Sequence, residues 1–322
     1  MTFETPTVGN PLVVYVCSGA RCGSTVLDMF LGAHPDIASL GELNMLGKAL
    51  RMDRPCSCGQ LVKECPAWTS VFARYKHDDG LDLIAEPYGL HLWEARAKFF
   101  VDRQHQTPRY ERRFRVKSAW LRLRRALPAA VGELLPLPPG YEQMLRNKMQ
   151  LYSRISVTWG KKVVVDSSKN AMEAIELARR WPMRVKVVLL TRDGRGVYLS
   201  HRTTGLERRE SLSGWAGYYR RYAPLIRRFI APANLVCLRY EDFARDPDGV
   251  GRRLCSELRV PFSSEMPSLG GDQRHLVDGN RTRLFPGRGV RLDERWRTEL
   301  EAEELAYFES HAGNLNRQLG YA

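Results

Sequence analysis

The sequence predicts an α/β fold, with a P-loop-like parallel sheet flanked by helices in a single domain that carries a helical insertion. Short apolar runs rich in β-branched residues alternate with segments whose apolar residues recur at helical spacing, which is the pattern of βα units. The expected strands cover residues 12–17, 162–166, 185–191 and 234–239. The helices expected after them cover residues 24–33, 171–181, 194–204 and 248–259. Small polar and basic loops follow the strands, so a ligand site is expected at their carboxyl ends.

Length and composition predict one large α/β domain, residues 1–322, because 43% of the residues are hydrophobic and can fill a sizeable core. The interval of approximately 43–160 separates the first βα unit from the next strand and is interpreted as the insertion. Its Arg-rich segment, 103–125, is interpreted either as a solvated helix whose arginine stems cover apolar surface, or as a lid or acceptor platform. A helix with an aromatic face is expected over 211–230, with core packing favoured over substrate stacking as its role.

The strand over 12–17 runs into a small glycine-punctuated loop and then into a helix. This stretch reads Ser18-Gly19-Ala20-Arg21-Cys22-Gly23-Ser24-Thr25. Backbone N–H groups in the first turn of a helix lack intrahelical partners, and the helix dipole favours negative charge there, so we expect a phosphate site. The hydroxyls of Ser24 and Thr25 can donate to the same anion. Gly23 stands where a triphosphate-binding P-loop needs a lysine, so the β- and γ-phosphates of a triphosphate with Mg²⁺ are not expected here.

A second strand-to-helix turn carries cations. The strand over 185–191 leads into Arg192-Asp193-Gly194-Arg195-Gly196. Ser200 follows Arg192 by about two helical turns and is expected on the helix face that looks back at the strand end. Arg192 and Ser200 are therefore predicted to bind one further phosphate together. Two such sites suit a nucleotide that carries both a 5′-phosphate and a 3′-phosphate.

The pair of motifs resembles the 5′-phosphosulfate loop and the 3′-phosphate motif of sulfotransferases that use 3′-phosphoadenosine 5′-phosphosulfate (PAPS). Other family-like segments follow in the expected order: Gly41-Glu42, Val165-Asp166-Ser167-Ser168-Lys169, Leu238-Arg239-Tyr240-Glu241-Asp242-Phe243, and His275-Leu276-Val277-Asp278-Gly279-Asn280-Arg281-Thr282-Arg283, with Asp293 and Trp296 behind them. The resemblance spans roughly residues 12–300. It is greatest to bacterial sulfotransferases related to the carbohydrate and tyrosylprotein branches.

This resemblance implies a PAPS-dependent enzyme that moves a sulfuryl group to a hydroxyl of a small-molecule or glycan-like acceptor by in-line displacement. Charge develops on the bridging oxygen of the leaving phosphate, and Arg21 and Lys169 are the expected cationic catalytic residues there. Glu42 is the expected catalytic base, by similarity to the Gly-Glu context of the tyrosylprotein branch. His275 is the competing candidate for the base; otherwise it is expected to order the loop that follows it.

The donor-binding residues that the motifs predict come from four parts of the chain. They are Arg21, Cys22, Gly23, Ser24, Thr25, Arg192, Ser200, Asn280 and Arg283. Arg283 is expected to add charge at the 3′-phosphate, and residues 279–283 are expected to lie over the nucleotide with Trp296 beneath them. No metal is expected to be required for the transfer, since cationic side chains supply the charge.

Three of the seven cysteines, Cys56, Cys58 and Cys65, lie within ten residues and are interpreted as a structural feature of the insertion. Reduced thiols, a zinc site and a disulfide are the alternatives, in that order. A zinc site needs four ligands, and the sequence shows no evident fourth, His77 being the nearest histidine. A disulfide is unusual in a reducing cytoplasm.

The formal charge is +14, from 50 Lys and Arg against 36 Asp and Glu. It is interpreted either as an ordinary basic surface or as attraction of an anionic donor or acceptor. Nucleic acid is not expected as a partner, because no helix-turn-helix, zinc-finger or RRM-like pattern is present. No apolar run approaches the ~18 residues of a membrane span, and no secretory signal is evident, so we expect a cytoplasmic protein. A P-loop-type nucleotide kinase and a non-catalytic polyanion-binding protein are the alternative functions.

Overall fold

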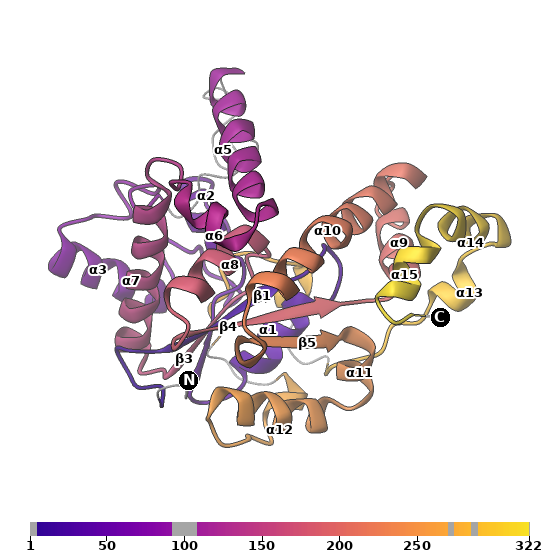
Figure 1. Ribbon diagram of the computed structural model, residues 1–322. Coiled ribbons are helices and arrows are strands. Elements are labelled where there is room, and N and C mark those ends of the chain that lie inside the picture. Colours follow the sequence, from indigo (N-terminus) through magenta and orange to yellow (C-terminus); the bar gives the residue numbers. More distant parts are fainter. Residues whose placement is uncertain (1–4, 92–107, 270–273, 285–288, 322) are drawn as a thin grey trace.

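The computed structural model describes residues 5–91, 108–269, 274–284 and 289–321 (Figure 1). Its strands are β1 (Leu12–Cys17), β2 (Ile37–Ser39), β3 (Val163–Asp166), β4 (Val185–Thr191) and β5 (Leu235–Arg239). They form a five-stranded sheet in the order β2-β3-β1-β4-β5, and every pairing is parallel. The predicted α/β fold is therefore confirmed. The one strand that the sequence did not indicate is β2, which at three residues is too short to show a periodic pattern.

Both faces of the sheet are buried, which explains why its inner strands are apolar throughout rather than alternating. Successive residues of a strand point to opposite faces. In β1, Val13 and Tyr15 contribute to one hydrophobic core cluster, whereas Leu12, Val14 and Val16 contribute to a second.

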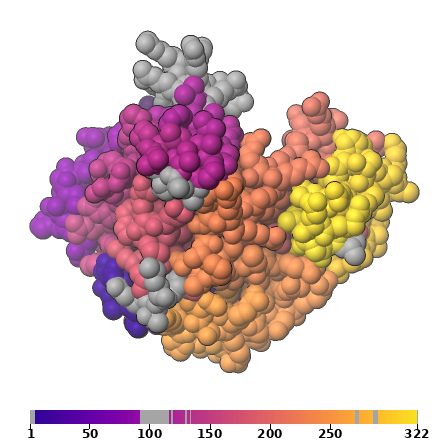
Figure 2. All heavy atoms as spheres, viewed as in Figure 1, coloured from indigo at the N-terminus to yellow at the C-terminus, as the bar shows by residue number. Residues whose placement is uncertain are grey.

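Helices cover the two faces in layers (Figure 1). The first core cluster packs against α3 (Pro66–Asp79), α7 (Tyr141–Trp159), α8 (Ala171–Arg180), α9 (Gly194–Arg202) and α10 (Arg208–Phe229). The second packs against α1 (Ser24–Gly32), α11 (Tyr240–Arg245) and α12 (Pro247–Leu258). The remaining helices are α2 (Leu46–Arg51), α5 (Pro108–Ala126), α6 (Ala129–Leu134), α13 (Trp296–Glu299), α14 (Ala302–Phe308) and α15 (Asn314–Gln318). Figure 2 shows the insertion helices in purple and magenta and the C-terminal helices in yellow at opposite ends of this face.

The four helices expected after strands correspond to α1, α8, α9 and α12, with ends that differ from the expected ones by at most two residues. The expected aromatic-faced helix is α10. Its Trp215 and Tyr219 are buried and pack edge to face with ring centroids 5.7 Å apart, which confirms a core role.

The end of α5 differs from the expectation of a solvated helix. Arg124 and Arg125 are buried and form ion pairs with Glu176 of α8, which is fully buried. These two arginines therefore fix the insertion to the core, since a buried carboxylate requires a cationic partner. Residues 103–107 of the Arg-rich segment lie outside the described residues.

None of the described helices combines the length and the apolar character needed to cross a membrane.

The topology places the loops of interest side by side. Central β1 has β3 on one side and β4 on the other, so the strand order reverses around it. Open α/β sheets bind ligands at such a switch point, beyond the carboxyl ends of the strands. The residues that follow these three strands are Ser18, Ser167 and Arg192.

Candidate active site

The loop between β1 and α1 ends at Gly23, which is the N-cap of α1 with a φ of 88°. A side chain here would be strained by this left-handed backbone, and its Cβ would lie 2.6 Å from the Tyr240 ring. No side chain among the described residues caps α1. The N–H groups of its first turn, at Ser24 and Thr25, are therefore available to an anion, as the sequence suggested.

The side chain of Cys22 faces the core rather than the open end of α1. Its Sγ lies 3.3 Å from Tyr219 Oη, which donates to the Leu190 carbonyl at 2.6 Å. Burial raises the pKa of the Cys22 thiol to about 11, so it stays protonated at neutral pH. Only the backbone of Cys22 is left to contact a ligand.

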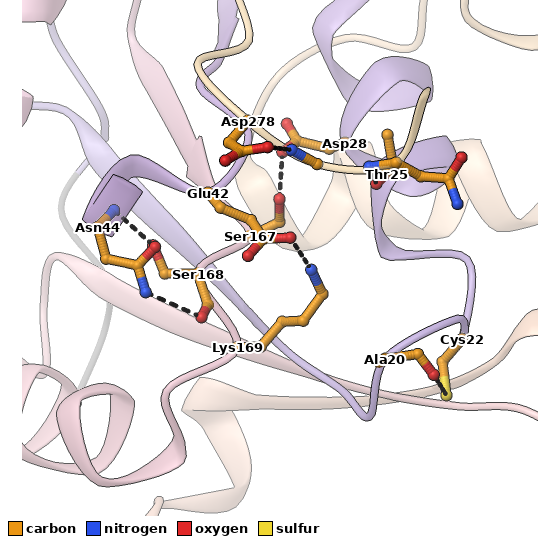
Figure 3. A network of polar contacts seen from close by, with 12 residues as sticks. Ala20, Cys22, Thr25, Asp28, Glu42, Asn44, Ser167, Ser168, Lys169 and Asp278 are labelled. Atoms are coloured by element: carbon orange, nitrogen blue, oxygen red, sulfur yellow. Dashed lines mark hydrogen bonds and ion pairs between the residues drawn. The ribbon is translucent and has the colours of Figure 1, made fainter. Parts of the chain in front are cut away.

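Two of the three residues expected to act in catalysis form an ion pair. Lys169 Nζ pairs with Glu42 Oε1, and both side chains are about one-fifth to one-quarter exposed, at 19% and 26% (Figure 3). Lys169 follows β3, and Glu42 follows β2. The pair thus forms where the carboxyl ends of two adjacent strands meet.

A set of backbone contacts holds the two segments together. Ser167 N donates to the Gly41 carbonyl at 2.9 Å, and Asn44 N donates to Ser168 Oγ at 3.1 Å. Gly41 has a φ of 70°, and a Cβ there would lie 2.4 Å from the Asp278 carbonyl oxygen. A glycine is therefore required directly before the expected base, which is a physical reason for the Gly-Glu pattern.

Arg21 and Lys169 both have a φ of 63°, in the left-handed region that residues other than glycine rarely adopt. Such a conformation costs on the order of 1–3 kcal/mol and persists only where its surroundings enforce it. For Lys169, the enforcing contacts are a bond from its N–H to the Val16 carbonyl at 3.2 Å and a bond from Tyr218 Oη to its own carbonyl at 3.1 Å. Strained backbone at both expected cationic residues is typical of functional loops.

A buried ionic network lies behind the Lys169 loop, and sequence reasoning missed it. Lys148 of α7 is fully buried between Asp166, at 3.0 Å, and Glu173. Asp166 also accepts from Ser168 N at 2.8 Å and from Tyr152 Oη at 2.6 Å. Burial alone would lower the pKa of Lys148, but the two carboxylates raise it, so the lysine is charged. No local sequence pattern marks Lys148 as buried, because its two carboxylate partners come from other segments of the chain.

Asp28 of α1 forms a second buried polar contact beneath the site. It accepts from Ser167 Oγ at 2.6 Å and from Ser39 Oγ. Burial raises the pKa of Asp28 to about 7, although these two hydrogen bonds lower it. The contact joins α1, β2 and the loop after β3, which are the elements that surround Glu42 and Lys169.

Arg192 lies buried at the end of β4, as expected, with part of its guanidinium engaged. Nη1 donates to the Arg21 carbonyl at 2.9 Å, Nη2 pairs with Asp293 at 3.0 Å, and the guanidinium lies 4.6 Å from the Tyr240 ring centroid. Its Nε has no partner among the described residues. A buried donor without an acceptor costs free energy, and an anionic ligand could supply the acceptor. Ser200 is half-buried on α9.

The start of α9 differs from that of α1, because side chains occupy its N–H groups. Asp193 accepts from Arg195 N at 2.9 Å, and Asn316 accepts from Gly194 N at 2.8 Å. An anion at this turn would therefore depend on side chains rather than on the end of the helix. Trp296 was expected beneath residues 279–283, but its ring instead lies 3.9 Å from the Arg195 guanidinium, against α9.

Residues 279–283 do lie over the first turn of α1. Asn280 N donates to Thr25 Oγ1 at 3.1 Å, and Asn280 itself is exposed. Arg283 is buried, donates from Nη2 to the Pro55 carbonyl at 2.8 Å, and has an unpartnered Nε among the described residues. Burial lowers the pKa of Arg283, while Asp278 opposes the shift. Its neighbours place it on the Glu42 side of the site.

The sequence shows no evident fourth ligand for the cysteine cluster, but the fold supplies a candidate. The fold brings His275 to Cys56, Cys58 and Cys65, although more than two hundred residues separate it from them. His77, the nearest histidine in sequence, is exposed and pairs with Asp78 at 2.7 Å. His275 also faces the cysteines with Nδ1, so it belongs to this cluster rather than to the Glu42–Lys169 pair.

Comparison with known proteins supports the family that the sequence motifs predict. The model of a family described as the sulfotransferase family matches residues 11–264. The sulfotransferase domain from the curacin biosynthetic pathway is 18% identical with a TM-score of 0.50, over 97% of this chain and 98% of that one. The sulfotransferase domain from the olefin synthase of Synechococcus PCC 7002 is 17% identical with a TM-score of 0.47, over 97% and 98% of the two chains. At such identity, the first likeness shows the fold alone. No curated protein sequence matches the chain.

The matched residues include the open start of α1, the Glu42 and Lys169 segments, and the strand and helix that carry Arg192 and Ser200. The family expected from the motifs is therefore confirmed, and the chain belongs to the sulfotransferase family of enzymes.

Proposed function

We propose that this sulfotransferase takes its sulfuryl group from PAPS and transfers it to a hydroxyl of a small-molecule or glycan-like acceptor. One observation carries the proposal: the Glu42–Lys169 ion pair lies at the same sheet edge as the uncapped start of α1. A base, a cation and an anion-binding helix terminus are the three elements that the transfer requires. A cytoplasmic location also stays a prediction.

In the proposed step, the acceptor oxygen attacks sulfur while the bond from sulfur to the bridging phosphate oxygen breaks. The bridging oxygen keeps the electron pair, and the acceptor proton passes to the Glu42 carboxylate. The products are a sulfate ester and 3′-phosphoadenosine 5′-phosphate. Lys169 and Arg21 stabilise the charge that develops on the leaving oxygen. Because the anionic donor competes with Glu42 for Lys169, donor binding frees the carboxylate to accept the proton.

The 3′-phosphate is assigned to Arg192 and Ser200. The unpartnered Nε of Arg192 supports this, since a phosphate oxygen would satisfy it with a charge-assisted hydrogen bond. The first turn of α1 would hold the 5′-phosphosulfate, covered by Asn280, whose N–H already contacts Thr25. The contacts of Arg283 favour a place nearer the sulfuryl group and Glu42 than the 3′-phosphate.

Calorimetry with two nucleotides tests the donor assignment. We expect 3′-phosphoadenosine 5′-phosphate to bind more tightly than adenosine 5′-phosphate. Ser200→Ala should lower the affinity for 3′-phosphoadenosine 5′-phosphate by about tenfold or more, because a hydrogen bond to a charged group is lost. The affinity for adenosine 5′-phosphate should stay unchanged. Ser213→Ala, which removes an exposed hydroxyl that contacts only its own helix, is the matched control. Equal affinity for both nucleotides would refute the assignment. Mass spectrometry of PAPS with a panel of hydroxylated compounds then tests transfer itself.

A further inference from the structure

Three thiols of the insertion and one imidazole from outside it converge at one point, in Cys56, Cys58, Cys65 and His275. Their candidate ligand atoms all lie within 4.8 Å of one another. Cys58 Sγ and Cys65 Sγ are 3.7 Å apart, and His275 Nδ1 lies 3.2 Å from Cys65 Sγ and 3.8 Å from Cys56 Sγ. We propose that these four side chains hold a structural zinc ion.

The distances between the ligand atoms fit a single tetrahedral ion. Zinc lies about 2.3 Å from thiolate sulfur and about 2.0–2.1 Å from imidazole nitrogen, so the corners of the tetrahedron are about 3.8 Å apart for two sulfurs and about 3.5 Å for sulfur and nitrogen. The sulfur–sulfur distance of 3.7 Å is close to the first value, and the sulfur–nitrogen distances of 3.2 Å and 3.8 Å lie on either side of the second. A disulfide needs about 2.05 Å between the sulfurs, and all seven cysteines are free thiols.

A tight hairpin brings Cys56 and Cys58 close together. Cys56 N donates to the Gln60 carbonyl at 2.8 Å, and Gly59 N donates to the Cys56 carbonyl at 3.0 Å. Gly59 has a φ of 91°, in the left-handed region that favours glycine. Cys65 follows as the N-cap of α3, so the backbone between residues 56 and 65 brings the three thiols to one place.

His275 is oriented by neighbours that leave Nδ1 facing the sulfurs. Its carbonyl accepts from Trp68 Nε1 at 2.8 Å, and its ring packs against Trp159 with centroids 5.7 Å apart. Such outer contacts fix the orientation of a ligating imidazole. Two of the three cysteines are buried, and only Cys58 is exposed, so the site is closed except at one corner.

The chemistry of the four ligand atoms favours Zn²⁺ over Mg²⁺ and Ca²⁺. Three sulfurs and one nitrogen in a tetrahedron suit Zn²⁺, whereas Mg²⁺ and Ca²⁺ require oxygen ligands at higher coordination number. Four protein ligands leave no open position for water or substrate, which is the pattern of a structural rather than a catalytic site. Three thiolates with one Zn²⁺ carry a net charge of −1, and the Arg283 guanidinium interacts electrostatically with Cys56 and offsets it.

The zinc ion would link residues 54–65 to residues 274–283. Polar contacts already join the same two segments: Ser57 Oγ donates to the Arg274 carbonyl at 2.8 Å, and Arg54 pairs with Asp278 at 2.8 Å. The second segment continues into Asn280, which contacts Thr25 at the start of α1. The zinc therefore positions the segment that covers the proposed donor site, without taking part in the transfer.

Metal analysis of the full chain tests the proposal directly. Protein purified from zinc-containing medium without chelator should contain close to one zinc ion per chain by plasma mass spectrometry. Cys58→Ser should lose most of the zinc at little packing cost, because Cys58 is exposed. Cys237→Ser, which replaces another exposed cysteine far along the chain on β5, should keep it. Replacing zinc with Co²⁺ should give the charge-transfer and ligand-field absorption of a tetrahedral thiolate site.

A stoichiometric Cys58–Cys65 disulfide in freshly reduced protein, full zinc content in Cys58→Ser, or iron in place of zinc would each overturn the proposal. If His275→Ala fails to fold, Cys58→Ser and the cobalt spectrum still decide the matter. Zinc removal should also lower the midpoint of thermal unfolding by several degrees. Neither metal content nor thermal midpoint depends on sulfuryl transfer, so failure here and failure of the proposed function are distinguishable.

Discussion

At the scale of single residues, the Glu42–Lys169 pair brings the expected base into direct contact with an expected cation. In the proposed transfer, each group has a distinct role. Glu42 would accept the acceptor's proton, and Lys169 would stabilise the charge on the leaving oxygen. Their two roles depend differently on the acidity of the acceptor, which makes them separable by experiment.

Replacing the two residues in turn should separate proton removal from leaving-group stabilisation. Glu42→Gln keeps the shape of the side chain but removes the base, so turnover should fall by ~10²–10⁴. Lys169→Ala should cost on the order of 10²–10³ in turnover. A phenol of low pKa loses its proton readily, so it should partly rescue Glu42→Gln and leave Lys169→Ala slow. Turnover of both variants with phenols of graded pKa checks this.

The controls for this pair are donor affinity and a poorly acidic acceptor. Donor affinity should be unchanged or slightly higher in Glu42→Gln, because the anionic donor no longer competes with a carboxylate for Lys169. Near wild-type turnover of Glu42→Gln on a poorly acidic alcohol would remove Glu42 from the mechanism.

Asp28 should make stability depend on pH. Its pKa is raised by burial to about 7, above its unfolded value, so the folded state holds a proton that the unfolded state has lost between about pH 4 and pH 7. The free energy of unfolding therefore falls as pH rises through this window. Asn at position 28 cannot ionise. The free energy of unfolding of Asp28→Asn, relative to that of wild type, should therefore rise by on the order of 2 kcal/mol from about pH 5 to about pH 8. Urea unfolding of both proteins at the two pH values measures this rise. If the two proteins differed in unfolding free energy by the same amount at both pH values, the raised pKa of Asp28 would be contradicted.

At the scale of elements, helix α7 of the insertion stabilises the loop that carries Lys169. Helix α7 supplies Lys148, which compensates Asp166 at the end of β3 and Glu173 at the start of α8. Asp166 in turn accepts hydrogen bonds from Ser168, directly before Lys169. The loop that carries Lys169 is thus held in place by the charged side chain of Lys148, which comes from a helix outside the βα units.

Lys148→Met should therefore destabilise the protein strongly. It leaves two buried carboxylates without a cation, and breaking such a pair costs about 3–5 kcal/mol. Lys162→Met is the matched control, because Lys162 pairs with Asp36 while 47% of its side chain is exposed. The control should cost no more than about 1 kcal/mol. Chemical denaturation of the two variants checks the contrast, and equal losses would show that the buried network contributes little.

At the scale of the whole molecule, the formal charge of +14 should speed the capture of an anionic donor. The association rate constant for 3′-phosphoadenosine 5′-phosphate should fall by about tenfold between low and high salt, because salt screens charges beyond ~10 Å. The dissociation rate should change much less. Stopped-flow binding at a series of salt concentrations checks this, and a salt-independent association rate would show that net charge has no role in capture.

The sequence predicted the sheet well because its signals are local. A buried parallel strand is a continuous apolar run, and the glycine and hydroxyl residues after β1 mark a helix start that can bind an anion. The three-residue β2 lacked enough residues for such a signal. The burial of Arg124 and Arg125 was also missed, because a basic helix looks solvated until its acidic partner is known.

By itself, the sequence determined the fold class and the family, and it predicted the two phosphate motifs and the catalytic residues. Tertiary structure alone decided which distant groups meet: Lys169 with Glu42, Lys148 with Asp166, and His275 with the cysteine cluster. The physical reason is that periodicity and turn chemistry act over a few residues, whereas these contacts form between segments brought together by packing. An ion pair or a metal site has no local pattern when its members come from different elements, so only the folded chain shows it.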